Sequence, residues 1–120
     1  MRWKNSLFII LIVLSSASYA ADSRYTMEKE IQHLFDHLQN SQCEFNRNGT
    51  WYTAEEAVEH IHTKYQFLMK KGLIDSTEQF IDRAASESSL SGKPYMVRCG
   101  ASEPIKSSDW FHEELRRFRE

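Results

Sequence analysis

The chain has 120 residues, which is enough for one domain and too few for two. It carries 15 Lys and Arg against 17 Asp and Glu, a formal net charge of −2. This balance argues against a general nucleic-acid-binding protein, because clustered positive charge supplies most of the affinity for a phosphate backbone.

The amino terminus has the three parts of a cleavable export signal. Arg2 and Lys4 give it a positive start, and residues 7–14 form an unbroken apolar run. Small side chains follow, with Ser18 and Ala20 at the two positions that a signal peptidase recognises. We therefore expect export and cleavage after Ala20.

Other interpretations of this segment fit its length and composition less well. A permanent membrane anchor needs about 20 predominantly apolar residues, and a lipid anchor needs a cysteine at the cut. Cleavage after Ala21 would place the bulky Tyr19 in a shallow peptidase pocket. We expect a signal peptide over residues 1–20 and one domain over residues 21–120. The removed segment holds two basic residues and no acidic one, so the formal charge of −2 becomes −4.

The two cysteines, Cys43 and Cys99, both lie in the expected mature domain. Export would place them in a compartment that permits oxidation, which favours a disulfide over the alternative of two free buried thiols. Closing this loop would stabilise a small domain by roughly 4 kcal/mol in the chain-entropy model. Two cysteines alone are too few for a structural zinc site, which uses four ligands.

The first predicted helix covers residues 25–39, where apolar side chains recur with the helical period. Asn40 and Ser41 end it. Its buried face comprises Met27, Ile31, Leu34, Phe35 and Leu38.

A short strand over residues 43–45 follows, and Asn48-Gly49 is a strong hairpin-turn signal because both residues tolerate positive φ. Trp51 and Tyr52 would form the second arm of the hairpin.

The next helix begins at a capping box, in which Thr53 is the cap and Glu56 lies three residues later. It should run to about Lys71 and end at Gly72. Its apolar stripe comprises Ala54, Ala57, Val58, Ile61, Tyr65, Leu68 and Met69.

A second capping box at residues 76–79 opens a helix that should reach about Ser86. Its buried side chains are Phe80, Ile81, Ala84 and Ala85. A serine-rich loop then leads to a strand over residues 95–99.

Residues 100–107 are predicted to be a linker, and Ser108-Asp109 to cap a last helix whose inward face is Phe111, Leu115 and Phe118. The order α-β-α-α-β-α makes the chain a small single-domain α+β protein. If the disulfide forms, it would hold two strands in one short sheet with helices packed on one face.

Four segments of the middle of the chain, residues 43–49, 56–60, 76–82 and 85–95, together resemble the YfeK-like family of short, secreted, uncharacterised bacterial proteins. The resemblance extends over residues 43–99. It implies the periplasm of a Gram-negative bacterium and implies no activity.

The candidate site follows one ridge of the second helix. Glu56, His60 and Lys64 are four residues apart, so they are neighbours on one face. A carboxylate and an amine beside a histidine can tune its pKa near neutral pH, although a solvated face with ordinary ion pairs is the simpler explanation. With the preceding hairpin and the serine loop, the candidate ligand- or partner-binding residues are Arg47, Asn48, Glu56, His60, Lys64, Ser88, Ser89 and Ser91.

The pattern therefore favours a non-enzymatic periplasmic binding or envelope-accessory module whose partner is an envelope protein or a small polar ligand. One alternative is a small hydrolase using His60 as the general base with Glu56 or a loop serine. Another is weak metal binding by His33 and His37, which are four residues apart. Trp51, Tyr52 and Trp110 are either core residues or anchors for a partner. No sequence motif for a catalytic centre or a cofactor is present.

Overall fold

The computed structural model describes the backbone of residues 13–120 and the side chains of residues 20–120. Most of the apolar run expected at residues 7–14 therefore lies outside the described residues. Among those described, no helix combines the length and the apolar character needed to cross a membrane.

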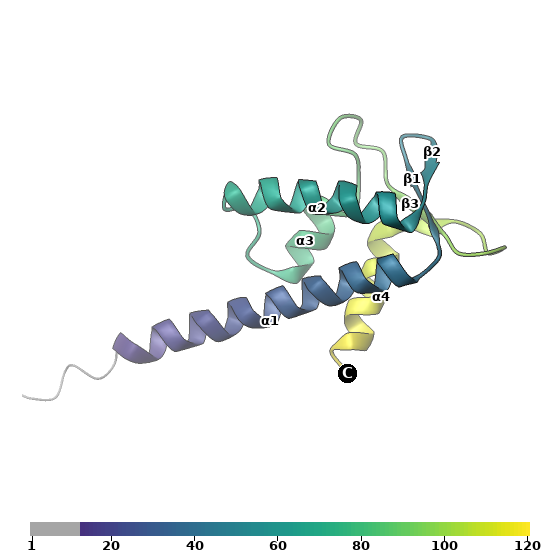
Figure 1. The fold of residues 1–120 in the computed structure, drawn as a ribbon. Coiled ribbons are helices and arrows are strands. Elements are labelled where there is room, and N and C mark those ends of the chain that lie inside the picture. Colours follow the sequence, from purple (N-terminus) through teal and green to yellow (C-terminus); the bar gives the residue numbers. More distant parts are fainter. Residues whose placement is uncertain (1–12) are drawn as a thin grey trace, which may run out of the picture.

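The first helix, α1 (Val13–Asn40), is longer than the expected residues 25–39. The preceding residues contain no Gly or Pro, so nothing in the local sequence stops the helix from continuing. The predicted buried face is confirmed, and Met27 is its first buried residue. The side chains of residues 20–26 are exposed, and this part of α1 extends beyond the rest of the fold (Figure 1).

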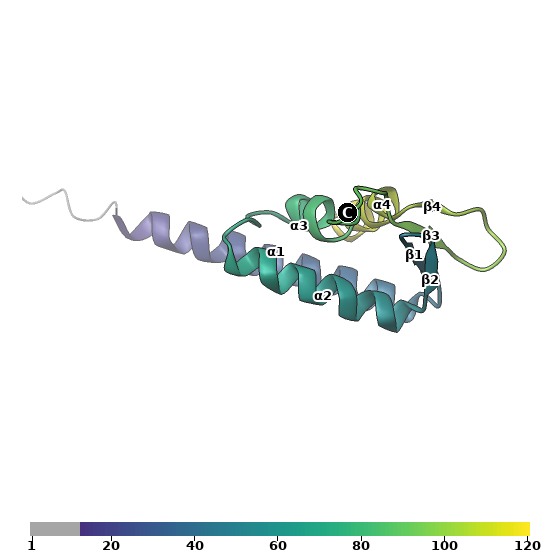
Figure 2. The same ribbon diagram turned by 90° about the horizontal axis from the view of Figure 1, so that it is seen from above.

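The sheet has four antiparallel strands in the order β2-β1-β3-β4 and lies at one end of the helices (Figure 2). The strands are β1 (Glu44–Arg47), β2 (Thr50–Tyr52), β3 (Met96–Arg98) and β4 (Ile105–Lys106). The expected hairpin turn is present between β1 and β2, with φ values of 54° at Asn48 and 87° at Gly49.

The disulfide between Cys43 and Cys99 is confirmed. These residues come directly before β1 and directly after β3, next to the paired residues Glu44 and Arg98. The bond therefore holds the central strand pair in register, and both strands bury one side chain on the face toward the helices, Phe45 and Val97.

The second helix, α2 (Ala54–Lys70), has the predicted boundaries at both ends. Thr53 and Glu56 form the full capping box. At the other end Gly72 has a φ of 69°, and the amide of Leu73 donates to the carbonyl of Leu68 at 3.0 Å, which is the Schellman pattern.

The third helix, α3 (Thr77–Ala84), is capped by Ser76, which accepts from the Gln79 amide. The Gln79 side chain accepts from the Asp75 amide instead of completing the box at Ser76. The helix ends before the expected Ser86, whose hydroxyl donates to the Ile81 carbonyl at 2.6 Å.

The predictions for residues 100–109 were wrong in two respects. The linker contains β4, a two-residue strand that pairs with β3 at the edge of the sheet formed by the described residues. The last helix, α4 (Ser107–Phe118), starts at Ser107 and not at a Ser108-Asp109 cap. Ser107 is fully buried and donates to the Ala85 carbonyl at 2.7 Å, so tertiary contact with the end of α3 fixes the start of α4.

The helices surround one core, in which α1 packs against α2, α3 and α4. Phe111 and Leu115 of α4 are buried as predicted, but Phe118 is 44% exposed. Its ring stacks on His33 with the ring centres 4.0 Å apart, so it covers the edge of the core.

Candidate functional site

A cavity of about 330 Å³ lies between α2, the end of β1 and the loop that joins α3 to β3. Figure 1 shows that loop rising beside the β1–β2 turn, next to α2. The cavity is at the lower end of the size range of small-molecule sites. Its lining residues are Arg47, His60, Thr63, Lys64, Phe67, Ser88, Ser89, Leu90 and Tyr95.

The Tyr95 hydroxyl connects two of the predicted site residues. Lys64 donates from Nζ to this hydroxyl at 3.3 Å, and Nε2 of His60 lies 3.1 Å from it. Because the lysine is the donor, the hydroxyl's own proton is available for the Nε2 of a neutral histidine. Lys64 also donates to the Glu87 carbonyl at 2.6 Å, which fixes the ammonium group over the cavity.

The electrostatics of this cluster favour the neutral forms of His60 and Tyr95. Burial lowers the pKa of His60, and the positive charges of Arg47 and Lys64 lower it further. Burial raises the pKa of the Tyr95 hydroxyl. Burial also lowers the pKa of Lys64, while the charge of Glu87 acts in the opposite direction.

Arg47 closes another side of the cavity at the end of β1. Its guanidinium lies 5.1 Å from the centre of the Tyr52 ring and donates to the Tyr52 hydroxyl at 3.5 Å. The contact uses only part of the donor capacity of the guanidinium, which has five N–H groups.

Asn48 and two serines hold the loop wall of the cavity in place. Asn48 donates from Nδ2 to Oγ of Ser88 at 3.1 Å and accepts from Oγ of Ser91 at 2.6 Å. Ser88 is buried, and its Oγ also accepts from the amides of Leu90 and Ser91. We call this set of contacts, made by Asn48, Ser88 and Ser91, the Asn48 clamp. It connects the hairpin turn to the loop across 40 residues of sequence.

Glu56 is the predicted site residue that lies apart from the others. Its Oε1 accepts from the amide and the hydroxyl of Thr53, and it does not line the cavity. Those Thr53 hydrogen bonds lower the pKa of Glu56. Within the described side chains, no hydrogen bond joins His60 to Glu56 or to a loop serine, which are the pairs that the hydrolase alternative requires.

Comparison with known proteins assigns the chain to a family. The family of unknown function DUF5329 matches residues 25–119, which include every residue that lines the cavity. The chain belongs to this family. The DUF5329 match also extends over the packed part of α1 and the whole of α4.

The resemblance to YfeK is confirmed as well. The chain is 46% identical over 57 residues to the uncharacterised protein YfeK of Salmonella typhimurium strain LT2. The match covers 48% of this chain and 46% of YfeK, so the chain spans about half the length of that relative. No solved structure matches this DUF5329 chain.

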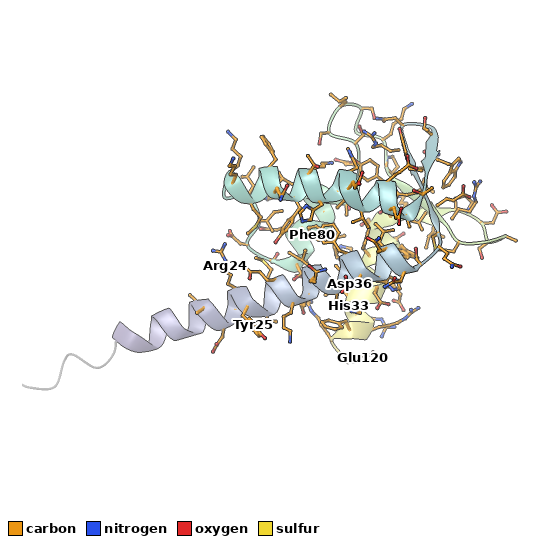
Figure 3. All side chains as sticks on the ribbon, viewed as in Figure 1. Arg24, Tyr25, His33, Asp36, Phe80 and Glu120 are labelled. Atoms are coloured by element: carbon orange, nitrogen blue, oxygen red, sulfur yellow. A yellow bond between two sulfur atoms is a disulfide. The ribbon has the colours of Figure 1, made fainter. Side chains whose placement is uncertain are left out.

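His33 and His37 of this DUF5329 chain face α4 and share one carboxylate. Glu114 Oε2 lies 2.6 Å from Nε2 of His33 and 3.7 Å from Nδ1 of His37. Figure 3 shows His33 beside the end of α4. Burial lowers the pKa of His37, which Glu114 partly offsets. The described side chains contain no group of three or more His, Cys, Asp and Glu residues arranged to hold a metal ion.

A second cavity, of about 480 Å³, lies beside Glu30 between α1 and the start of α3. Four of its polar side chains bind one another. Thr77 donates to Glu30 at 2.6 Å, and Arg119 binds both Glu30 and Glu78. We interpret this second cavity as part of a structural network.

Sequence reasoning missed four residues of the first cavity: Thr63, Phe67, Leu90 and Tyr95. The sequence places Tyr95 in a strand. Its contacts with Lys64 and His60 of α2 join residues that are 31 and 35 positions apart in the chain. Phe67 and Leu90 do not belong to any predicted buried stripe. An apolar residue outside such a stripe is the sequence signal that could have placed them at the surface.

Proposed function

We propose that this member of DUF5329 is an exported periplasmic protein that acts as a small non-enzymatic binding module. Its site is the cavity formed by Arg47, His60, Lys64 and the serine loop. The observation that carries the proposal is the convergence of these polar side chains, from three separate segments, on one partly enclosed space.

Export is supported by two features. The amino-terminal sequence has the three-part signal layout, and the disulfide between Cys43 and Cys99 fits an oxidising compartment. The proposed cut after Ala20 falls in α1 before Met27, where the side chains are exposed, so cleavage would leave the packed face of α1 intact.

A binding role is supported by how the cavity is built. The Asn48 clamp holds the loop wall, and Lys64 is fixed by two hydrogen bonds. A site with its polar groups already fixed loses less side-chain freedom when a ligand binds. Among the described side chains, the hydroxyl in contact with His60 is that of Tyr95, and no loop serine makes the contact with His60 that a serine nucleophile would need.

Intact-mass analysis tests the export step. The full-length chain is expressed in a Gram-negative bacterium, and the protein is recovered from the periplasm. We expect a polypeptide that starts at Ala21 and lacks two hydrogens because of the disulfide. An intact amino terminus would contradict the signal peptide, and two free thiols would contradict oxidation.

An NMR fragment screen tests the binding step on the exported protein. The panel contains anionic, neutral and cationic fragments at millimolar concentration, and the readout is the backbone amide shifts of isotope-labelled protein. We expect at least one fragment to shift the resonances of residues 60–67 and 87–91 together. If every fragment leaves these two segments unchanged, the cavity is not a binding site.

A further inference from the structure

We propose that the ligand of this cavity is an apolar monocarboxylate, held by its carboxylate at Arg47 and Lys64 and by its apolar group at Phe67 and Leu90. This inference rests on the binding function proposed above and adds the chemical class of the ligand.

Within residues 20–120, Arg47 and Arg83 are the two arginines without a carboxylate partner, and Arg47 is the one that lines the cavity. The side-chain contacts that Arg47 makes among these residues are with Tyr52. A free guanidinium can bind a carboxylate through two parallel hydrogen bonds. Salt bridges to glutamate occupy most of the others, namely Arg24, Arg98, Arg116, Arg117 and Arg119.

Lys64 has one donor left for a ligand. An ammonium group carries three N–H donors, and Lys64 uses two of them, one on the Glu87 carbonyl and one on the Tyr95 hydroxyl. These two bonds hold Nζ at the cavity, so the third N–H needs little reorganisation to meet an anion.

The charges around the cavity favour a single anionic group. Arg47 and Lys64 are positive. His60 and Tyr95 are neutral near pH 7, because burial lowers the pKa of the first and raises that of the second. Glu87 supplies one negative charge close enough to raise the pKa of Lys64. The net charge of about +1 matches one carboxylate better than a multiply charged ligand.

The mouth of the cavity is apolar. Leu90 is 94% exposed and Phe67 is 57% exposed, although side chains of this size are usually buried. Both line the same cavity as the two cations. A ligand that covered them would remove apolar surface from water, which favours binding. An apolar group next to the carboxylate therefore fits this half of the site.

A matched set of probes tests the proposal by NMR titration of the exported protein. Octanoate has both the carboxylate and the apolar chain. 1-Octanol keeps the chain but has no charge, octylammonium has the chain with a positive charge, and acetate has the carboxylate without the chain. We expect octanoate to bind at least tenfold more tightly than each of the other three, because a charge-assisted hydrogen bond and a buried chain each contribute a kcal/mol or more. N-acetyl-leucine, a mimic of a peptide carboxyl end, is titrated alongside. Tighter binding by either acid supports a monocarboxylate ligand. The acid that binds more tightly indicates whether the ligand is a fatty acid or the carboxyl end of a peptide.

Paired variants connect the binding to the named residues. Lys64→Gln and Arg47→Gln should each weaken octanoate binding about tenfold. Lys70→Gln, on the same helix and outside the cavity, should have no effect. Leu90→Ser should weaken binding about threefold or more, whereas Leu73→Ser changes an exposed leucine outside the cavity and should leave binding unchanged. Circular dichroism checks that each variant is folded.

The outcomes separate the ligand class from the binding function itself. Equal binding of 1-octanol and octanoate, preference for octylammonium, or unchanged affinity in Lys64→Gln and Arg47→Gln would each overturn the carboxylate proposal. In those cases a cavity that still takes up other fragments keeps its binding function. If neither these probes nor any fragment of the panel perturbs residues 60–67 and 87–91, both proposals fail.

Discussion

The guanidinium of Arg119 donates to both carboxylate oxygens of Glu30, at 2.7 Å from Nε and 3.0 Å from Nη2. This contact joins the end of α4 to the middle of α1, 89 residues apart in sequence. Glu30 is buried and also accepts from the Thr77 hydroxyl, while Arg119 reaches Glu78 as well. One side chain thus connects α4 to both α1 and α3.

Replacing Arg119 should destabilise the fold. Arg119→Gln leaves the buried carboxylate of Glu30 without its cation, and we expect the free energy of unfolding to fall by about 1–2 kcal/mol, limited by the partial exposure of Arg119. Urea denaturation measures the loss. Arg116→Gln is the matched control, because its partners Glu113 and Glu120 are exposed, and its loss should be much smaller. Equal losses would show that burial of Glu30 does not matter.

The same network predicts how stability responds to acid. Hydrogen bonds from Arg119 hold the pKa of Glu30 and of Glu78 below the ordinary value. Such carboxyl groups take up protons more readily in the unfolded chain, so they stabilise the fold above the ordinary pKa of about 4.3. That stabilisation is lost as the pH falls through the lower pKa of the folded protein.

In Arg119→Gln the stabilisation by the low pKa values of Glu30 and Glu78 is absent even at neutral pH. The difference in unfolding free energy between the parent protein and Arg119→Gln should therefore shrink as the pH falls from about 6 to 3. Urea denaturation at several pH values gives both curves. A difference that stays constant over this range would mean that the two carboxyl groups have ordinary pKa values in the fold.

Local sequence signals predicted much of the fold because each acts over a few residues. The Thr53–Glu56 capping box, the Asn48-Gly49 turn and the buried face of α1 from Met27 to Leu38 depend on chain neighbours. The disulfide followed from the expected compartment and from the lack of another cysteine.

Features that depend on tertiary contact were not predictable in this way. Strand β4 has two residues and is held in the sheet by its pairing with β3. The start of α4 is set by the contact of Ser107 with Ala85, 22 residues away. The Tyr95 hydroxyl joins the site through two residues of α2, and no pattern around residue 95 indicates this.

Removal of the disulfide should destabilise the protein more than any of the single side-chain changes above. Changing Cys43 and Cys99 together to Ala frees a loop of more than 50 residues in the unfolded chain. We expect a loss of up to about 4 kcal/mol in the free energy of unfolding. The parent protein treated with a reductant should lose a similar amount. A loss below about 1 kcal/mol in both would show that pairing of β1 with β3 does not need the bond.

If the Asn48 clamp holds the loop, two substitutions of Asn48 should loosen the loop to different degrees. Asn48→Gly keeps the left-handed backbone of the turn, because glycine tolerates positive φ, but it removes both contacts to the loop. Asn48→Asp keeps an oxygen for the Ser91 hydroxyl and loses only the donor to Ser88.

We expect the amides of Leu90 and Ser91 to exchange with solvent fastest in Asn48→Gly and at an intermediate rate in Asn48→Asp, because both amides donate to the Oγ that Asn48 helps to position. Hydrogen exchange followed by NMR gives each rate. Ser89→Ala is the control within the same loop, since it leaves every contact of the Asn48 clamp in place, and its rates should match the parent protein. If Asn48→Gly exchanged no faster than Ser89→Ala, the loop would hold its shape without the hairpin turn, and the wall of the cavity would not depend on Asn48.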